Sequence, residues 1–151
     1  MIDLTTTQAR LALGRKYAAK YLLDSALVCA LVERESSWNP WATRYEPAFY
    51  RTYIQKFIDS AKIVNMTEAT MRATSFGLGQ VMGQVARELG FTGRYLTELC
   101  DPEIGLDYAC RKLQQCVDAH MDNVPGALSQ YNGGGDPTYA PAVIALMTKY
   151  F

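Results

Sequence analysis

The longest apolar segment of the chain lies in its N-terminal third. Residues 26–32 are apolar on every face of a helix, and a helix of that kind is buried inside a domain. Asp24 is a favourable N-cap, and the pair Asn39-Pro40 stops the helix because the residue before a proline avoids the α region. The pattern therefore predicts a buried central helix with Glu35 in its last turn.

Helical periodicity, caps and first-turn prolines continue along the chain. The other predicted helices cover residues 6–22, 46–61, 102–120, 124–130 and 139–151. The glycines at 77, 79 and 83 indicate close backbone approach at the start of one more helix, which ends at Gly90. We expect a loop at residues 41–45, and at residues 67–74 a mobile or partly helical connection that forms a cleft rim. No run alternates between apolar and polar residues, so the predicted fold is all-α, with seven or eight helices around the central one.

Length and charge limit the possible classes of protein. The chain has 151 residues, 49% of them hydrophobic, so we expect residues 1–151 to form a single domain around one core. Lys plus Arg and Asp plus Glu number 15 each, and no net charge attracts the chain to nucleic acid or to an anionic membrane. Neither a membrane-spanning run nor a signal peptide at residues 1–4 is recognisable. We expect no nucleic-acid partner, no stable membrane insertion, and synthesis in the cytoplasm without a signal peptide.

Cysteine, histidine and glycine positions do not favour a metal or a cofactor. The four cysteines form no C-x-x-C pair, and although Cys116 and His120 could share a helix face, two ligands do not make a structural zinc site. The stretch 77–83 carries Met82 where the dinucleotide fingerprint requires its third glycine. We expect reduced thiols, no metal and no cofactor.

Glu35 is the strongest candidate for acid–base chemistry. It shares a helix face with Leu27, Val28 and Leu31, so its carboxyl group is expected where the buried stripe reaches a cleft. Partial burial raises the pKa of a carboxyl group and keeps it protonated, as a general acid requires. Glu33 lies two residues earlier, points to another side and is expected to be solvated.

Three short motifs follow one another at wide spacing. They are Glu35-Ser36, Gly77-Leu78-Gly79-Gln80 and Tyr131-Asn132-Gly133. In this order, and together with the pair Asp101-Pro102, they resemble the lytic transglycosylases of the goose-type lysozyme superfamily over about residues 26–145. The resemblance implies a lysozyme-like helical domain. The family has methionine at the position of Gly79, so we expect one side chain fewer on the cleft wall.

Enzymes of this family cleave the β-1,4 bond between N-acetylmuramic acid and N-acetylglucosamine in peptidoglycan and form a 1,6-anhydro product. The resemblance implies that Glu35 is the single acid and base and that no metal or cofactor is required. The remaining motif positions would contact substrate or Glu35. Ser36 would bind near the reacting sugar or orient Glu35, Gly77, Leu78 and Gln80 would line subsites for N-acetyl groups, Tyr131 would hydrogen-bond or pack against Glu35, and Asn132 would shape the loop.

Several of these side chains have a structural alternative. Ser36 and Asn132 are equally suited to capping and turn formation, and Tyr131 could be a core ring whose hydroxyl is satisfied. Tyr45 could either stack on a sugar or pack in the core, and the sequence favours neither. The helical spacing of Tyr53 favours the core.

The segment after the central helix departs from the family pattern. Residues 41–62 insert Tyr45-Glu46-Pro47-Ala48-Phe49-Tyr50, as in versions from bacteriophage and prophage cell-wall enzymes. Tyr45 and Glu46 therefore join the candidate substrate-binding residues. An inverting hydrolase needs a second carboxylate about 6.5–9.5 Å from the acid. Glu46 and Asp59 are the candidates, so hydrolysis to a reducing end is an alternative outcome.

A protein that binds peptidoglycan without cleaving it, such as an assembly component, is an alternative of another class. The Glu35-Ser36 pair favours an enzyme over such a protein. We expect peptidoglycan glycan strands as the partner, a monomeric state, and action on the cell wall after release as an endolysin or as part of a phage particle.

Overall fold

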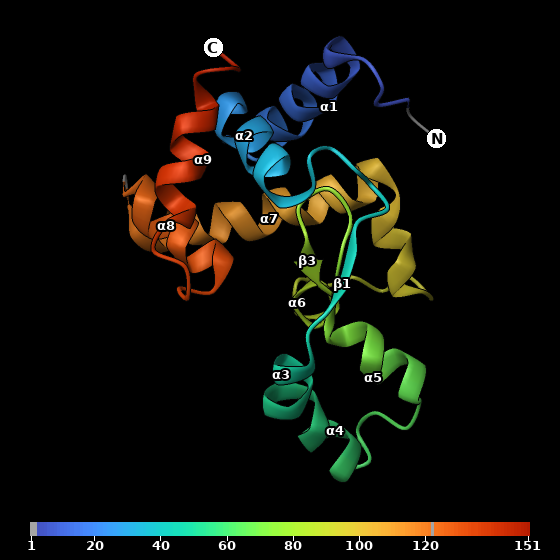
Figure 1. Ribbon diagram of the computed structural model, residues 1–151. Coiled ribbons are helices and arrows are strands. Elements are labelled where there is room, and N and C mark those ends of the chain that lie inside the picture. The colour runs from blue at the N-terminus through green and yellow to red at the C-terminus, as the bar shows by residue number, and fades with distance from the viewer. Residues whose placement is uncertain (1–2, 122) are drawn as a thin grey trace.

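The computed structural model describes residues 3–121 and 123–151 and is mostly helical (Figure 1). The larger part of the molecule is built from α1 (Thr7–Lys20), α2 (Ser25–Ser36), α7 (Pro102–His120), α8 (Val124–Asn132) and α9 (Tyr139–Met147). Helix α2 packs against α1 and α9, and α7 packs against α1 and α8. The sequence predictions for Met1 and Ile2 lie outside the described residues.

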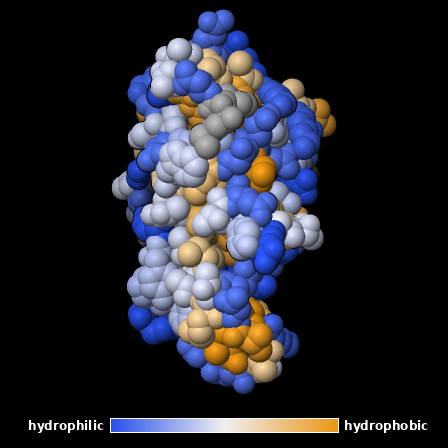
Figure 2. Space-filling view, turned by 90° about the vertical axis from the view of Figure 1, so that its right-hand side faces the viewer, coloured by the Kyte–Doolittle hydropathy of each residue, from blue (hydrophilic) through white to orange (hydrophobic). Residues whose placement is uncertain are grey.

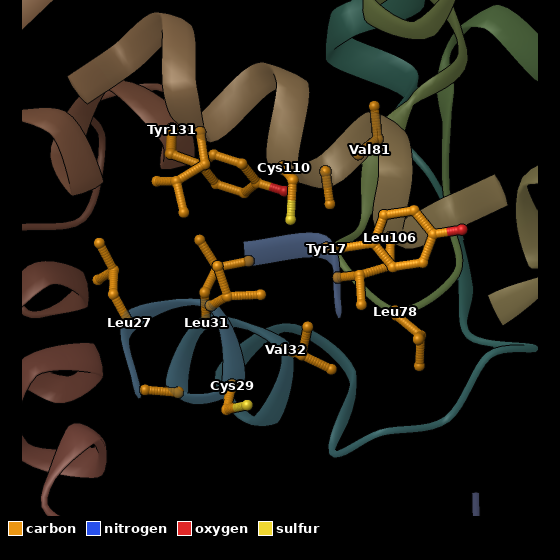
Figure 3. Close-up of a cluster of buried hydrophobic side chains, with 14 of the residues drawn as sticks. Tyr17, Leu27, Cys29, Leu31, Val32, Leu78, Val81, Leu106, Cys110 and Tyr131 are labelled. Atoms are coloured by element: carbon orange, nitrogen blue, oxygen red, sulfur yellow. The ribbon is translucent and has the colours of Figure 1, made fainter. Parts of the chain in front are cut away.

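Helix α2 is the buried centre of the fold, as the hydropathy pattern predicts. Every residue from 26 to 32 is buried, and each large apolar side chain there contributes about 1.5–3 kcal/mol. Figure 3 shows Leu31 pointing from α2 toward Tyr131 of α8. The side chain of Asp24 caps the helix by accepting the backbone N–H of its first turn at 3.0 Å. The helix ends at Ser36 because the next residue, Ser37, has a left-handed conformation with a φ of 51°.

A small antiparallel sheet follows α2, and the sequence did not indicate it. Its strands are β1 (Thr43–Tyr45), β2 (Thr74–Phe76) and β3 (Val81–Met82). They lie in the order β1-β2-β3, with Phe76 opposite both Thr43 and Val81. The prediction of a loop at residues 41–45 is wrong for residues 43–45, which form β1, and holds for Trp41 and Ala42. Strands of two or three residues are too short to show alternation, and β2 is buried throughout, so the period-2 signal is missing.

A smaller group of helices lies below the sheet in Figure 1. Its elements are α3 (Pro47–Phe49), the π-helix η1 (Tyr50–Ile54), α4 (Gln55–Asp59) and α5 (Met66–Arg72). They enclose a small core of Ile54, Ile63, Ala69 and Ala73, separate from the main one. We call residues 46–73 the lower lobe.

Apolar side chains are also exposed on this lobe. Figure 2 shows hydrophobic surface gathered at the lower end of the molecule. Val64 and Met66 of the lower lobe are 85% and 57% exposed.

Of two predictions for the lower lobe, one is confirmed and one needs correction. Residues 67–74 were expected to be a mobile or partly helical connection, and they are partly helical: residues 67–72 belong to α5, whose first turn is capped by the Asn65 side chain, which accepts two backbone N–H groups. Tyr53 was expected in the core and is instead 50% exposed. The wider turn of the π-helix shifts the helical register, so Ile54 takes the buried position. The predicted helix at 46–61 is confirmed as α3, η1 and α4.

Two further short elements are α6 (Gly83–Glu88) and the 3-10 helix η2 (Leu96–Cys100). Gly90 follows α6 with a φ of 94°, as predicted for a glycine after a helix end. If α3, η1 and α4 count as one segment, the described ranges contain eight α-helical segments, and the predicted helical class is confirmed. Across residues 3–121 and 123–151, no helix combines the length and the apolar character that a membrane crossing requires.

The cysteines are all buried as free thiols. They are Cys29, Cys100, Cys110 and Cys116. Burial raises the pKa of Cys29 to about 11 and that of Cys110 to about 12. Gly14 of α1 packs directly on Cys29, since a Cβ at position 14 would lie 2.4 Å from the Cys29 sulfur.

Candidate active site

Glu35 occupies the last turn of α2, where the buried face of the helix ends. Its side chain is partly buried, and Oε1 accepts a hydrogen bond from the hydroxyl of Tyr139. Tyr139 is the first residue of α9 and is itself buried. The packing of α9 along α2 therefore brings together two groups that are 104 residues apart in the sequence.

The surroundings of Glu35 have opposing effects on its protonation. Burial raises the pKa of Glu35, whereas the hydrogen bond from Tyr139 and the positive charges of Lys112, Arg34 and Arg44 lower it. Burial is the largest effect, and the pKa remains above its ordinary value. Burial also raises the pKa of Tyr139, so its hydroxyl stays protonated and can donate. Glu35 is thus suited to hold a proton and to release it to a bound group.

Ser36 connects α2 to the turn between β2 and β3. Its hydroxyl donates to the backbone oxygen of Leu78 at 2.8 Å and is 3.2 Å from that of Val32. The structure therefore places Ser36 next to the glycine motif, and its contact with sugar stays a prediction.

The turn of residues 77–80 is held by the close fit of Gly77 and by the side-chain amide of Gln80. Gly77 has a φ of 70°, and a Cβ there would lie 2.3 Å from the backbone oxygen of Leu99, so only glycine fits without a shift. The side-chain amide nitrogen of Gln80, Nε2, donates to the backbone oxygens of Ala42 and Gly77 at 2.9 and 3.0 Å. Gln80 thereby fastens the turn to the segment before β1.

Gly79 faces the interior of the molecule. A Cβ at this position would lie 2.3 Å from the Cβ of Ala109 and 2.9 Å from the hydroxyl oxygen of Tyr131. The expectation that this glycine removes a side chain from the cleft wall therefore differs from the structure. Its small size instead allows the turn to approach α7 and α8 closely.

The tyrosine of the third motif supports that turn. Tyr131 is buried, and its hydroxyl donates to the backbone oxygen of Gly79 at 2.7 Å. The hydroxyl that reaches Glu35 belongs to Tyr139 instead. Asn132 is exposed at the end of α8 and precedes Gly133, whose φ is 92°. The three motifs thus meet around one turn, with Leu78 completely buried beneath it.

The inserted residues Tyr45 and Glu46 lie at the C-terminal end of β1, where Tyr45 is the last residue of the strand and Glu46 follows it. Tyr45 is 45% exposed and its ring contacts that of Tyr50 edge-on at 6.3 Å. Glu46 forms an ion pair with Arg44 at 2.5 Å. Asp59, the other carboxylate considered for hydrolysis, is exposed on α4 of the lower lobe and accepts a hydrogen bond from Gln55 at 3.0 Å.

Two residues of the site were missed in the sequence. Tyr139 gave no signal, because only the packing of α9 on α2 brings it to Glu35. Lys112 did give one, since it is a charged residue on the helix face that carries the apolar Ala109 and Cys116. In the described ranges, no three His, Cys, Asp or Glu side chains come close enough together to hold a metal ion.

A buried central helix that ends in a partly buried carboxyl group with a raised pKa is the arrangement of a lysozyme-like, glycan-cleaving domain. Residues 12–140 match the transglycosylase SLT domain. The match covers most of the chain, which therefore belongs to this family and is a peptidoglycan-degrading enzyme of the lytic transglycosylase type. The resemblance drawn from the three motifs is thus confirmed.

A solved structure shows the same fold. The crystal structure of the Burkholderia AP3 phage endolysin is similar at 18% identity, over 93% of this chain and 69% of that one, with a TM-score of 0.63. No curated protein matches the chain.

Proposed function

We propose that the chain cleaves the bond between N-acetylmuramic acid and N-acetylglucosamine and releases a 1,6-anhydro product, with Glu35 as the single acid and base. The observation that supports this most is the environment of Glu35, which is partly buried, has a raised pKa and accepts a hydrogen bond from Tyr139. Because Oε1 accepts from Tyr139, the carboxyl proton is available on Oε2 to be donated to substrate.

The reaction needs two proton transfers by the same carboxyl group. Glu35 first gives its proton to the glycosidic oxygen, and the bond from that oxygen to C1 of the muramic acid breaks. The C6 hydroxyl oxygen then attacks C1, and the Glu35 carboxylate takes the hydroxyl proton, which restores the acid. One group can serve both steps only if its pKa lies near the working pH. Opposing effects of burial and nearby donors, as found at Glu35, suit that requirement.

The other predicted residues are proposed to build the substrate cleft around this acid. Ser36 and Tyr131 hold the turn of residues 77–80 through its backbone oxygens. We propose that this turn lines the subsites through Gln80, which is partly exposed, and that the buried Gly77 and Leu78 shape the turn behind it. We further propose that Tyr45 of β1 and the following residue, Glu46, contact a longer glycan strand and that Asn132 shapes the opposite rim.

The cellular setting is proposed from the same comparison. The structural likeness to a phage endolysin supports an endolysin or a virion-associated enzyme that acts on glycan strands of the cell wall. We infer that the chain forms one domain, because α1, α2, α7, α8 and α9 share the main core, and we propose that it acts as a monomer.

The test is mass spectrometry of soluble products from purified peptidoglycan. The unmodified chain should release anhydro-muropeptides, and Glu35→Gln should reduce their release by at least about a thousandfold, because loss of the acid removes both proton transfers. Glu33→Gln is the matched control on the same helix turn. Glu33 points away and pairs with Lys149 at 2.6 Å, so this variant should keep its activity.

Other product patterns would contradict the proposal and favour one of the alternative functions. Reducing-end muropeptides would indicate hydrolysis and a search for a second carboxylate, beginning with Glu46 and Asp59. Sedimentation with cell walls without any product would indicate a binding protein.

A further inference from the structure

Lys112 is a charged side chain on an apolar face of α7. The residues one turn before and after it, Ala109 and Cys116, are buried in the main core, and Lys112 is itself only partly exposed. Burial lowers the pKa of Lys112, because it disfavours the charged ammonium. Lysine is seldom placed in such surroundings without a specific partner.

Tyr131 fixes the position of the ammonium group. Nζ of Lys112 donates to the backbone oxygen of Tyr131 at 2.7 Å and lies 4.0 Å from the centre of the ring of the same residue. A hydrogen bond and a cation–π contact to one buried residue restrict the side chain strongly. Tyr131 is held in turn by the bond from its hydroxyl to Gly79. The charge of Lys112 therefore has a defined place beside the proposed active site.

The turn of residues 77–80 brings this ammonium and Glu35 together. Ser36, next to Glu35, donates to the backbone oxygen of Leu78, and Tyr131, which holds Lys112, donates to that of Gly79. No ion pair of the described residues includes Lys112, so it is separated from Glu35 by more than the 4.0 Å of a direct pair, and the charge of each acts on the other from that distance. The titratable and charged groups that surround them come from every element packed there. They are Tyr139 of α9, Arg34 of α2, Arg44 of β1, Tyr131 of α8 and Cys116 of α7.

Lys112 differs from the two arginines in its surroundings. Arg34 and Arg44 are exposed, and each forms an ion pair with a carboxylate of its own, at 3.7 and 2.5 Å. Solvent and these partners screen their charges. The charge of Lys112 is less screened, because the side chain is packed against Tyr131.

We propose that Lys112 is a positioning residue of the glycan-cleaving site, whose fixed ammonium stabilises the carboxylate of Glu35 after its proton has passed to the leaving oxygen. This inference rests on the proposed role of Glu35. The separation is part of the argument, because a direct ion pair would keep Glu35 ionised and prevent it from acting as an acid. A more distant charge supports the ionised form without excluding the protonated one.

The variant Lys112→Gln tests the inference, because it keeps a donor for the Tyr131 carbonyl and removes the charge. Loss of the charge raises the pKa of Glu35 further, so the alkaline limb of the kcat/KM profile for anhydro-muropeptide release moves to higher pH. The ratio of the rate on that limb to the rate at the optimum should rise roughly threefold to tenfold, as Coulomb's law gives for one charge beyond ion-pair distance.

Two control variants separate charge from packing. Lys112→Arg retains the charge and should leave the limb close to its original pH. Lys16→Met removes an exposed ammonium that pairs with Glu103 near the other end of α7, and its limb should not move. A limb that stays in place in Lys112→Gln, or that moves equally in Lys16→Met, would overturn the inference.

The outcome remains decisive if a variant or the proposed reaction fails. Should Lys112→Gln not fold, Lys112→Met is measured in the same way. Should the unmodified chain release no anhydro product, the proposed function fails and NMR titration of the Glu35 carboxyl carbon decides the inference. An upward shift on loss of Lys112 supports it, and an unchanged titration contradicts it.

Discussion

At the scale of single residues, the hydroxyl of Tyr139 is the closest partner of the proposed catalytic acid. It donates to Glu35, and this hydrogen bond is the largest of the effects that lower the pKa of Glu35 against the rise caused by burial. A hydrogen bond to a charged group contributes about 1.5–3 kcal/mol, more than a neutral one. The hydroxyl therefore favours the carboxylate form, which the second half of the reaction needs.

Tyr139→Phe should lower activity and change its pH dependence. Without the hydroxyl, the pKa of Glu35 rises further, so the protonated form persists to higher pH and the alkaline limb of kcat/KM moves upward. We expect kcat/KM at the optimum to fall about 10-fold to 100-fold, the effect of losing one such hydrogen bond. The pH profile of product release checks both expectations.

Tyr131→Phe is the natural comparison for that variant. Its hydroxyl bonds to Gly79 and not to Glu35, so its loss should reduce stability and leave the alkaline limb unmoved. An unchanged limb in Tyr139→Phe would show that its hydroxyl does not act on the acid.

The residues of the site differ in how far sequence reasoning could find them. Glu35 and the motif positions carry local signals, because a helix end and a glycine turn are recognisable in a few consecutive residues. Tyr139 contributes a hydroxyl from the first turn of a distant helix, and its partner depends on how α9 packs on α2. Such a long-range contact leaves no periodic or spacing signal along the chain.

At the scale of elements, the turn of residues 77–80 is where sequence and structure differ most. Long helices such as α7 were found with their boundaries, since caps and apolar spacing extend over many residues. Strand β2 depends instead on pairing with β1, where Ser75 lies opposite Arg44, 31 residues earlier in the chain, and β3 pairs with β2. The glycines were correctly associated with close backbone approach, but Gly77 and Gly79 lie in the turn of a hairpin, and the helix begins only at Gly83.

Gly79→Met, which restores the residue usual in the family, should destabilise this chain. The new Cβ would overlap Ala109 and Tyr131, both held in the core. Overpacking of this kind costs typically about 1–3 kcal/mol. Urea unfolding would measure the loss.

Gly135→Ala is the control, since a Cβ at that position meets nothing within 4 Å. Its free energy of unfolding should change by less than about 0.5 kcal/mol. Equal stability of Gly79→Met and the unmodified chain would mean that α7 and α8 can move apart at this point.

At the scale of the whole molecule, the main core and the lower lobe form separate apolar clusters. The main cluster contains the central helix, whereas the lobe depends on the few residues around Ile54. A small core contributes less apolar burial, and regions with few buried contacts open at lower free energy. We infer that the lobe is the less stable part of the fold.

Ile54→Ala should therefore loosen the lobe and spare the main core. Removing a completely buried isoleucine side chain costs about 2–5 kcal/mol. Amide hydrogen exchange should accelerate within residues 46–73 and remain unchanged in the middle of α2 and α7. Uniform acceleration across both parts would show that the two cores unfold as one unit.

The buried thiols give the fold a chemical consequence of its own. A thiol must ionise and meet its reagent before it can be alkylated, and Cys29 and Cys110 do neither readily while the helices around them remain packed. Both belong to the main core and neither to the lower lobe. Alkylation of Cys29 or Cys110 therefore marks the molecules in which the helices of the main core have separated, and the chain reports the opening of its own core without an added label.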